Sequence, residues 1–383
     1  MKRKIILFTL VVLAISGFLI SQAFVEFTKT RDPYPADVYV GVTADGNVTA
    51  TKTLIDKTRD FTNLLVINNP AVIRNKTSLN EVCDHARGAG LAFFVYMAHP
   101  AFWQFNYNPL EWVSEAKAEY GKHFLGVYLY DEPGGNQLDL GKFRQYDYTH
   151  DMPTNYRDAA NTYVYYLYVQ MRDLIKIDKL VTSDYGLFWF DYEAGYDAIF
   201  CEFGSNRIKE INIALCRGAA EMHNKTWGVM ITWSYDNPPY IESAGELYED
   251  MITAYQAGAK YIIVFNYPET GTYGLLTDEH FTAIKQFKNF ISKNPQNKTS
   301  NLQKLAYVLP ENYGWGLRGP KDKIWGVWEA DEKSPKIWSD LNNLVEKYDH
   351  DFDIVYDCPW TRLFAKQHYN TLIWWNGTVQ KLH

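Results

Sequence analysis

Several short motifs that mark common enzyme classes are missing from this 383-residue sequence. It contains no G-x-S-x-G, no H-E-x-x-H, no Walker-type loop, and no C-x-x-C or Cys/His spacing that suits a metal ion. These motifs carry the nucleophile of α/β-hydrolases, the zinc site of metalloproteases and the phosphate cradle of P-loop enzymes. Their absence disfavours those classes, and the sequence implies no metal and no organic cofactor.

Positive charge is also scarce. There are 38 Lys and Arg against 45 Asp and Glu, which gives a formal net charge of -7. No concentrated basic patch is present, so a nucleic-acid partner is disfavoured. Hydrophobic residues at 47% and charged residues at 22% are ordinary for a globular chain, and the length suits one large domain plus a smaller one.

The first residues have the pattern of a targeting segment. Basic residues at positions 2–4 precede the uncharged apolar run Ile5–Ile20, and small residues around Ser21 suit signal peptidase. Residues 1–25 are therefore predicted to be a signal peptide or a retained N-terminal anchor, which would attach the chain to a membrane. Residues 26–37 are polar and contain proline, as in a linker. Both alternatives place the protein outside the cell or at its surface.

Two further features suit an exported protein. Five N-x-Thr sequons are potential glycosylation sites, at Asn47, Asn75, Asn224, Asn297 and Asn376. The four cysteines are Cys83, Cys201, Cys216 and Cys358. An even number permits disulfides outside the cell, so a Cys201–Cys216 bridge and buried free thiols are the two alternatives.

From residue 38 onward, short apolar runs alternate with amphipathic stretches. The runs are continuous rather than alternating, which is typical of strands in a buried parallel sheet. Eight strands are predicted: Val38–Thr43, Leu64–Asn68, Ala92–Ala98, Leu125–Asp131, Leu180–Asp184, Ala198–Phe203, Gly228–Trp233 and Tyr261–Tyr267. Seven helices are predicted: Thr51–Phe61, Ser78–Gly88, Pro109–Tyr120, Thr154–Lys176, Asn206–Met222, Ser243–Ala257 and Asp278–Ser292. The connection 185–197 is too short for a full helix.

Eight strands with alternating helices predict a (β/α)8 TIM barrel over residues 38–295. A doubly wound open sheet is the alternative, but no G-x-G-x-x-G follows the first strand, which weakens a nucleotide-binding version of it. A polar break at 294–301 ends the barrel. Residues 302–383 are predicted to form a small α/β domain, with strands at 305–309, 353–356 and 371–375 and a helix at 335–348.

The function of a TIM barrel is located at the C-terminal ends of its strands. The predicted strand ends are rich in acids, amides and aromatic rings, which suits a carbohydrate because polar groups bind its hydroxyls and rings stack on its apolar face. The predicted substrate-binding residues are Asp45, Asn68, His99, Trp103, Asp184, Trp233, Tyr235, Tyr267 and Glu269. Among them, Trp103, Trp233, Tyr235 and Tyr267 would be the stacking platforms.

The fourth predicted strand runs directly into two adjacent carboxylates, Asp131 and Glu132. Side chains alternate along a strand, so Glu132 would continue the inward face of Tyr128 and Tyr130 into the barrel mouth. Asp131 would begin on the outer face, and Pro133 could rotate it inward. Capping or bracing the loop is the structural alternative for both acids.

Glycoside cleavage needs a proton donor and a second group that attacks or stabilises the anomeric carbon. Glu132 with Glu202 would form a two-carboxylate site of the retaining or inverting type. Asp131 with Glu132 would instead suit a substrate-assisted mechanism, with Asp131 orienting an acetamido group. Burial beside another carboxylate would raise the pKa of Glu132, as a general acid requires.

The tetrapeptide Tyr130-Asp-Glu-Pro133 resembles a motif of TIM-barrel glycoside hydrolases. In the clan with its acid/base on strand four, the tripeptide is Asn-Glu-Pro, and Asp131 stands here at the position of Asn. The Asp-Glu pair is similar to that of substrate-assisted N-acetylhexosaminidases, and a barrel followed by a small α/β domain resembles thermophilic-type β-galactosidases. The sequence departs from the clan at the seventh strand, where Ile231–Asp236 has no Glu. The two-Glu retaining mechanism of the clan would therefore require Glu202 or Asp236 as a substitute nucleophile.

The sequence thus predicts an exported glycoside hydrolase that acts on an oligo- or polysaccharide, with Glu132 as general acid/base and with Asp131 and Glu202 as its partners. A non-catalytic surface barrel that binds glycans and a structural cell-envelope protein are the alternatives.

Overall fold

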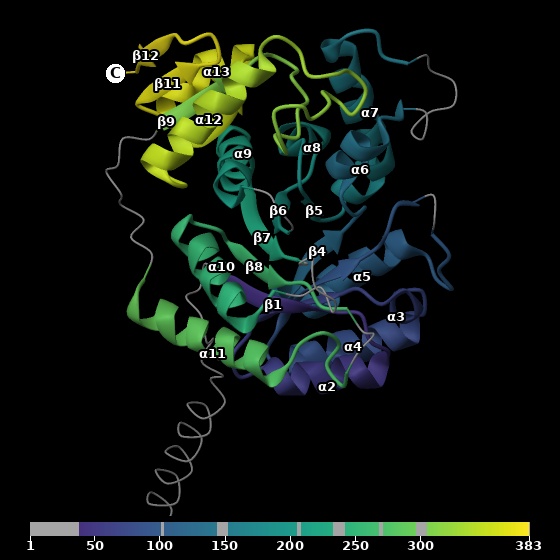
Figure 1. Cartoon of the computed structure of the whole chain (residues 1–383). Helices are drawn as coiled ribbons and strands as arrows, with labels where there is room; N and C mark the ends of the chain where they lie inside the picture. The colour runs from purple at the N-terminus through teal and green to yellow at the C-terminus, as the bar shows by residue number, and fades with distance from the viewer. Residues whose placement is uncertain are drawn as a thin grey trace, which may run out of the picture. The chain divides into compact units, whose positions relative to one another are not determined.

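The computed structural model describes residues 38–100, 103–143, 152–204, 208–232, 242–267, 271–295 and 305–382. Eight parallel strands close into a barrel in the order of the chain, β1 to β8, as Figure 1 shows. The strands are β1 Tyr39–Ala44, β2 Leu64–Ile67, β3 Ala92–Tyr96, β4 Phe124–Tyr128, β5 Leu180–Asp184, β6 Ala198–Phe203, β7 Thr226–Ile231 and β8 Tyr261–Val264. The predicted TIM barrel is confirmed.

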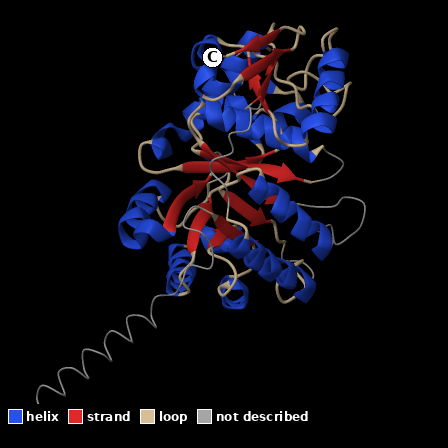
Figure 2. Ribbon diagram, turned by 90° about the vertical axis from the view of Figure 1, so that its left-hand side faces the viewer, coloured by secondary structure: helices blue, strands red, loops and turns tan. Residues whose placement is uncertain are grey.

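Helices cover the outside of the barrel (Figure 2). They are α2 Val48–Thr58, α3 Pro70–Ile73, α4 Lys76–Gly88, α5 Pro109–Tyr120, α6 Pro133–Leu140, α7 Tyr156–Ile175, α8 Phe188–Ala194, α9 Lys209–Met222, α10 Ala244–Gln256 and α11 Asp278–Lys293. The helix α10 begins with the predicted capping box between Ser243 and Glu246. The short helices α3 and α6 were not predicted, and the connection after β5 contains the two-turn helix α8.

Two hydrophobic layers stabilise this arrangement. Inside the barrel, Phe94, Phe200 and Tyr261 pack with their rings 5.5–5.7 Å apart, so side chains fill the interior. Tyr128 of β4 belongs to the same interior cluster, which confirms its predicted inward direction. The second layer lies between the outer faces of the strands and the helices.

The strand β4 ends three residues earlier than predicted. Tyr130 and Glu132 both have left-handed backbone conformations, with φ of 58° and 51°. Two such residues break the alternation of an extended strand. Asp131 and Glu132 therefore lie in the β4–α6 loop, and strand parity does not decide their directions.

A second sheet follows the barrel. Its strand order is β10-β9-β11-β12, with β12 antiparallel and not predicted from the sequence. Its strands are β9 Leu305–Leu309, β10 Asp353–Tyr356, β11 Thr371–Trp374 and β12 Val379–Lys381, with helices α12 Ser334–Tyr348 and α13 Pro359–Phe364. The residues from Tyr34 to His383 form one compact unit that contains both sheets. The predicted boundaries of the two domains stay a prediction.

The second sheet is anchored on α9. Arg217 of α9 donates from Nε to Asp353 Oδ1 at 2.6 Å and from Nη2 to the Phe352 carbonyl at 2.9 Å. On the next residue, a Cβ added to Gly218 would lie 2.3 Å from the Ile354 carbonyl oxygen. Helix α9 thus approaches β10 so closely that only glycine fits. This helix follows directly after β6, the strand that carries Glu202.

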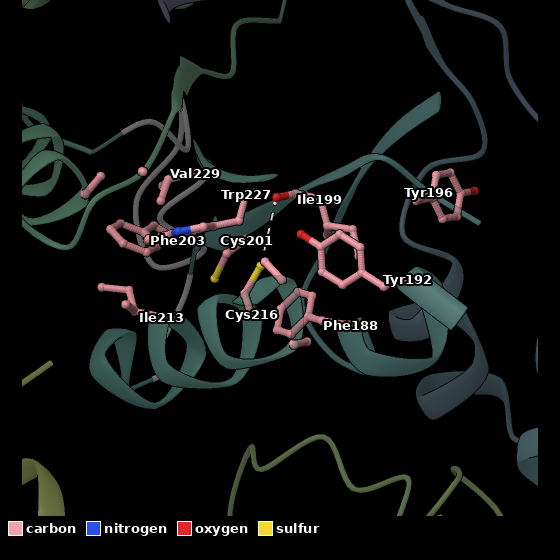
Figure 3. Close-up of a cluster of buried hydrophobic side chains, with 14 of the residues drawn as sticks. Phe188, Tyr192, Tyr196, Ile199, Cys201, Phe203, Ile213, Cys216, Trp227 and Val229 are labelled. Carbon is pink, nitrogen blue, oxygen red and sulfur yellow. Dashed lines mark hydrogen bonds between the residues drawn. The ribbon is translucent and has the colours of Figure 1, made fainter. Parts of the chain in front are cut away.

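The cysteines are free thiols, and Cys83, Cys201 and Cys216 are buried. Figure 3 shows Cys201 and Cys216 in the apolar layer between β6 and α9, where Cys216 Sγ donates weakly to the Ile199 carbonyl. The free-thiol alternative is therefore the one that the structure contains.

The predicted targeting segment 1–25 and the linker 26–37 lie outside the described residues. Among the helices that are described, none has the length and apolar character needed to span a bilayer. Export and cellular location stay predictions.

Candidate active site

The β4–α6 loop carries the two adjacent acids and is built on a tight helix start. Pro133 is the first residue of α6, where its missing N–H costs nothing. A Cβ on Gly134 would lie 2.3 Å from the Gly186 carbonyl oxygen, and a Cβ on Gly135 would lie 2.1 Å from the Tyr185 ring. The pair of glycines thus lets α6 begin against the β5–α8 turn.

Asp184 holds this loop in place. Its carboxylate accepts hydrogen bonds from the backbone N–H groups of Gly134 at 2.6 Å, Gly135 at 2.8 Å and Tyr185 at 2.6 Å. The residue is 0% exposed, and burial raises its pKa to about 7 although these bonds oppose the shift. Both oxygens of Asp184 are thus used in capping α6, and its predicted substrate contact stays a prediction.

A chain of polar groups crosses the barrel mouth from β4 to β6. The Tyr128 hydroxyl donates to Asp131 Oδ1 and lies 2.7 Å from Ser183 Oγ. Ser183 Oγ lies 3.1 Å from Asp131 Oδ1 and 2.6 Å from Glu202 Oε1, and it can donate to either. Asp131 and Glu202 are thus connected through one serine hydroxyl.

Glu132 joins the same cluster. Its carboxyl is half-buried and shares a hydrogen bond with the carboxyl of Glu202. Two carboxyls in hydrogen-bond contact cannot both be ionised, so the pair holds one proton between them. The structure thus brings together all three residues that the sequence predicts to be catalytic, although their roles stay a prediction.

Burial keeps Asp131 and Glu202 protonated to higher pH than ordinary carboxylic acids. Burial, followed by the charges of Glu132 and Asp131, raises the pKa of Glu202 well above its usual range, and the Ser183 bond opposes this. Burial also raises the pKa of Asp131, while the bonds from Tyr128 and Ser183 lower it. Asp131 is open to solvent at the mouth, but enough protein surrounds its carboxyl to weaken its hydration.

A cavity of about 200 Å³ opens at this end of the barrel. Three predicted site residues, Asp45, Asn68 and Asp131, are on its walls, in confirmation of their predicted location at the mouth. The remaining described lining residues are Thr43, Pro70, Tyr96, Tyr128, Met230 and Phe265. The described lining thus combines two acids, one amide and three aromatic rings.

The aromatic rings in the cavity differ from those predicted. Tyr96, Tyr128 and Phe265 line it. Trp103 instead donates its indole N–H to the Met97 carbonyl at 2.8 Å and packs against Phe105 at a ring distance of 5.5 Å. Tyr267 is half-buried and is not among the described lining residues. The other predicted contacts, Trp233, Tyr235 and Glu269, lie outside the described residues.

His99 is held by aromatic neighbours. Its Nε2 is hydrogen-bonded to the Tyr166 hydroxyl of α7, and its ring meets Tyr130 edge-to-face at 4.8 Å. Burial lowers its pKa, so the imidazole is neutral near pH 7. His99 thus has a hydrogen-bond partner within the protein, and its predicted substrate contact stays a prediction.

Sequence reasoning missed Ser183, Tyr96 and Phe265. Ser183 was detectable in principle, because on β5 it has the parity of the interior residue Val181 and lies next to the strand end. Tyr96 and Phe265 lie at strand ends, but the prediction was based on the polar residues beside them. Within the described ranges, no group of three or more His, Cys, Asp or Glu side chains could hold a metal ion.

Comparison with known proteins adds information on the fold. No protein-family model matches the sequence, and no curated protein matches it. Many solved structures are similar in fold. They include an α-L-fucosidase isoenzyme from Paenibacillus thiaminolyticus, with a TM-score of 0.51 and 12% identity over 88% of this chain. This chain spans 59% of that fucosidase.

Two further neighbours are more distant. An endo-1,4-β-xylanase from Penicillium canescens has a TM-score of 0.43 and 11% identity, covering 66% of this chain and 94% of the xylanase. A β-glucosidase from Thermotoga maritima has a TM-score of 0.42 and 12% identity, covering 67% of this chain and 99% of the glucosidase. At these identities the likeness shows the TIM-barrel fold alone.

Proposed function

We propose that this protein is a glycoside hydrolase that acts on an oligo- or polysaccharide. The observation that carries the proposal is the convergence of Asp131, Glu132 and Glu202 at the mouth of the barrel, beside a cavity lined by amide and aromatic groups. The similar solved structures named above include enzymes that cleave glycosidic bonds, which agrees with this chemistry.

Glu132 is the general acid in this proposal. The proton that it shares with Glu202 is available at neutral pH, because burial and the neighbouring charges hold it there. Glu132 is the less buried member of the pair, so it delivers the proton to the glycosidic oxygen. Glu202 holds this shared proton next to Glu132 until the transfer.

Asp131 faces the substrate in the same scheme. It lines the cavity and is hydrogen-bonded by Tyr128 and Ser183, which fix the direction of its carboxyl. From this wall it stabilises positive charge at the anomeric carbon or orients an acetamido group. An N-acetylated substrate distinguishes these two roles.

The test is a panel of 4-nitrophenyl and 2,4-dinitrophenyl glycosides, with and without N-acetyl groups, assayed with wild type and Glu132→Gln. We expect kcat to fall by roughly 10²–10⁴-fold for the 4-nitrophenyl substrate. The fall should be smaller with 2,4-dinitrophenyl, because a good leaving group needs less protonation. Glu346→Gln, an exposed change on α12, is the matched control. Equal turnover by wild type and Glu132→Gln would sink the assignment.

A further inference from the structure

Asp45 is a second acid on the cavity wall, distant in the chain from the cluster around Glu132. It follows the last residue of β1 and precedes α2. The side chain of Asn69 braces it, donating from Nδ2 to the Asp45 carbonyl at 2.7 Å and hydrogen-bonding its carboxyl. Asn69 is itself fixed, because its Oδ1 accepts from the Val72 N–H at 3.0 Å at the start of α3.

Asp45 and Asp131 reach the cavity from different sectors of the barrel. The strands β2 and β3 separate β1 from β4 in the closed order, yet both acids line the same 200 Å³ space. A sugar in this space would therefore have a carboxyl on each of two sides. An inverting glycosidase uses an acid on one face of the ring and a base on the other.

Asp45 also lines a second, smaller cavity. This cavity has a volume of about 40 Å³. Its lining includes Thr51, Asn266 and the segment 271–274. A polar cavity can hold a water molecule once its volume exceeds roughly 10–15 Å³, so this one has room for at least one water. Asp45 thus lines both a cavity large enough for a sugar ring and a cavity with room for water.

The acidity of Asp45 suits the removal of a proton from water. Burial raises its pKa to about 6, although the bond from Asn69 opposes the shift. A carboxylate with this pKa is mostly ionised at pH 7, and it is a stronger base than an ordinary aspartate. The raised pKa of Asp45 agrees with its position on the cavity wall.

We propose that Asp45 is a catalytic residue: the general base that activates the hydrolytic water at the β1 sector of the cavity wall. The proposal rests on the proposed glycosidase function. The water oxygen bonds to the anomeric carbon while its proton passes to the Asp45 carboxylate. The glycosidic C–O bond breaks with its electron pair on the leaving oxygen, which takes the proton from Glu132. Solvent then removes the proton from Asp45 and restores the one at the Glu132–Glu202 pair.

Asp45→Asn tests this role with the same aryl glycosides. We expect kcat to fall by roughly 10²–10⁴-fold with either leaving group, because water activation is needed whatever departs. This pattern differs from that of Glu132→Gln, where the better leaving group relieves the defect. Asn68→Ala is the comparison on the same wall, and it should raise KM more than it lowers kcat. Asp45→Ser serves as the second variant, and urea unfolding checks that both fold.

Stereochemistry supplies an independent readout. Proton NMR of the first product formed by wild type should show an anomer inverted relative to the substrate. A retained anomer, or an Asp45→Asn variant that changes only KM, would overturn the base assignment. Loss of activity in Glu132→Gln but not in Asp45→Asn would contradict the role of Asp45 and leave the glycosidase function standing. If the wild type turns over no glycoside in the panel, the proposed glycosidase function itself is contradicted.

Discussion

Ser183 connects Asp131 and Glu202, so substitution of its hydroxyl tests whether these hydrogen bonds matter for activity. Ser183→Ala removes the group that lies 2.6 Å from Glu202 Oε1 and 3.1 Å from Asp131 Oδ1. Asp131 keeps the bond from Tyr128, but Glu202 loses the donor of a buried oxygen. An unsatisfied buried acceptor costs about 1–3 kcal/mol, so the free energy of unfolding should fall by that amount.

The same substitution should move the pH dependence of activity. The Ser183 bonds lower the pKa of both Asp131 and Glu202, so their removal raises both values. The acid limb of kcat/KM reports the carboxyl that must be ionised, and the alkaline limb reports the proton donor. The alkaline limb, which depends on the proton shared by Glu132 and Glu202, should therefore shift to higher pH, while the acid limb, which depends on Asp45, should stay in place.

The matched control is Ser334→Ala. Ser334 is 0% exposed and its hydroxyl lies 2.7 Å from the Tyr313 hydroxyl and 3.4 Å from an Asp331 oxygen, outside the barrel. Urea unfolding with linear extrapolation should show a similar loss of stability, with an unchanged pH profile. If Ser183→Ala loses stability but leaves the alkaline limb in place, the chain through Ser183 only supports the fold and the reasoning is refuted.

Two further predictions concern the framework. Gly134→Ala places a Cβ 2.3 Å from the Gly186 carbonyl oxygen, so it should cost about 1–3 kcal/mol in urea unfolding and abolish activity. Gly245→Ala is the control, because the nearest atom to its added Cβ is 3.9 Å away. It should change stability and activity little. Arg217→Met leaves the buried Asp353 without its cation and should cost about 3–5 kcal/mol in urea unfolding. The exposed Arg362→Met should cost much less, and equal losses for the two arginines would contradict the anchoring role of α9.

The barrel was readable from the sequence because its strands are continuous apolar runs separated by helices. The loop that carries the acids was not. Alternation correctly directs Tyr128 inward, but it fails beyond Leu129 because Tyr130 and Glu132 adopt left-handed conformations. No local preference of Tyr or Glu indicates this. The close packing of Gly134 and Gly135 against the β5–α8 turn imposes it.

The limits of the site prediction have a similar cause. Asp184 has the position of a mouth residue, yet its carboxylate caps α6, which begins about 50 residues earlier in the chain. Capping by a remote segment leaves no local signal. Asp45, Asn68 and Asp131 were identifiable because polarity at a strand end is a local property. Which aromatic rings turn toward the cavity depends on packing between distant strands.

The cap of α6 also bears on which ligands this barrel can accept. The first N–H groups of a helix form a ready site for a phosphate or another anion. In α6 the N–H groups of Gly134 and Gly135 are already bound to the protein's own carboxylate, Asp184. A phosphorylated ligand could use this helix only by expelling a buried aspartate and releasing the Glu132 loop with it. An anion that binds at the N-terminus of this helix therefore has to compete with the protein's own carboxylate.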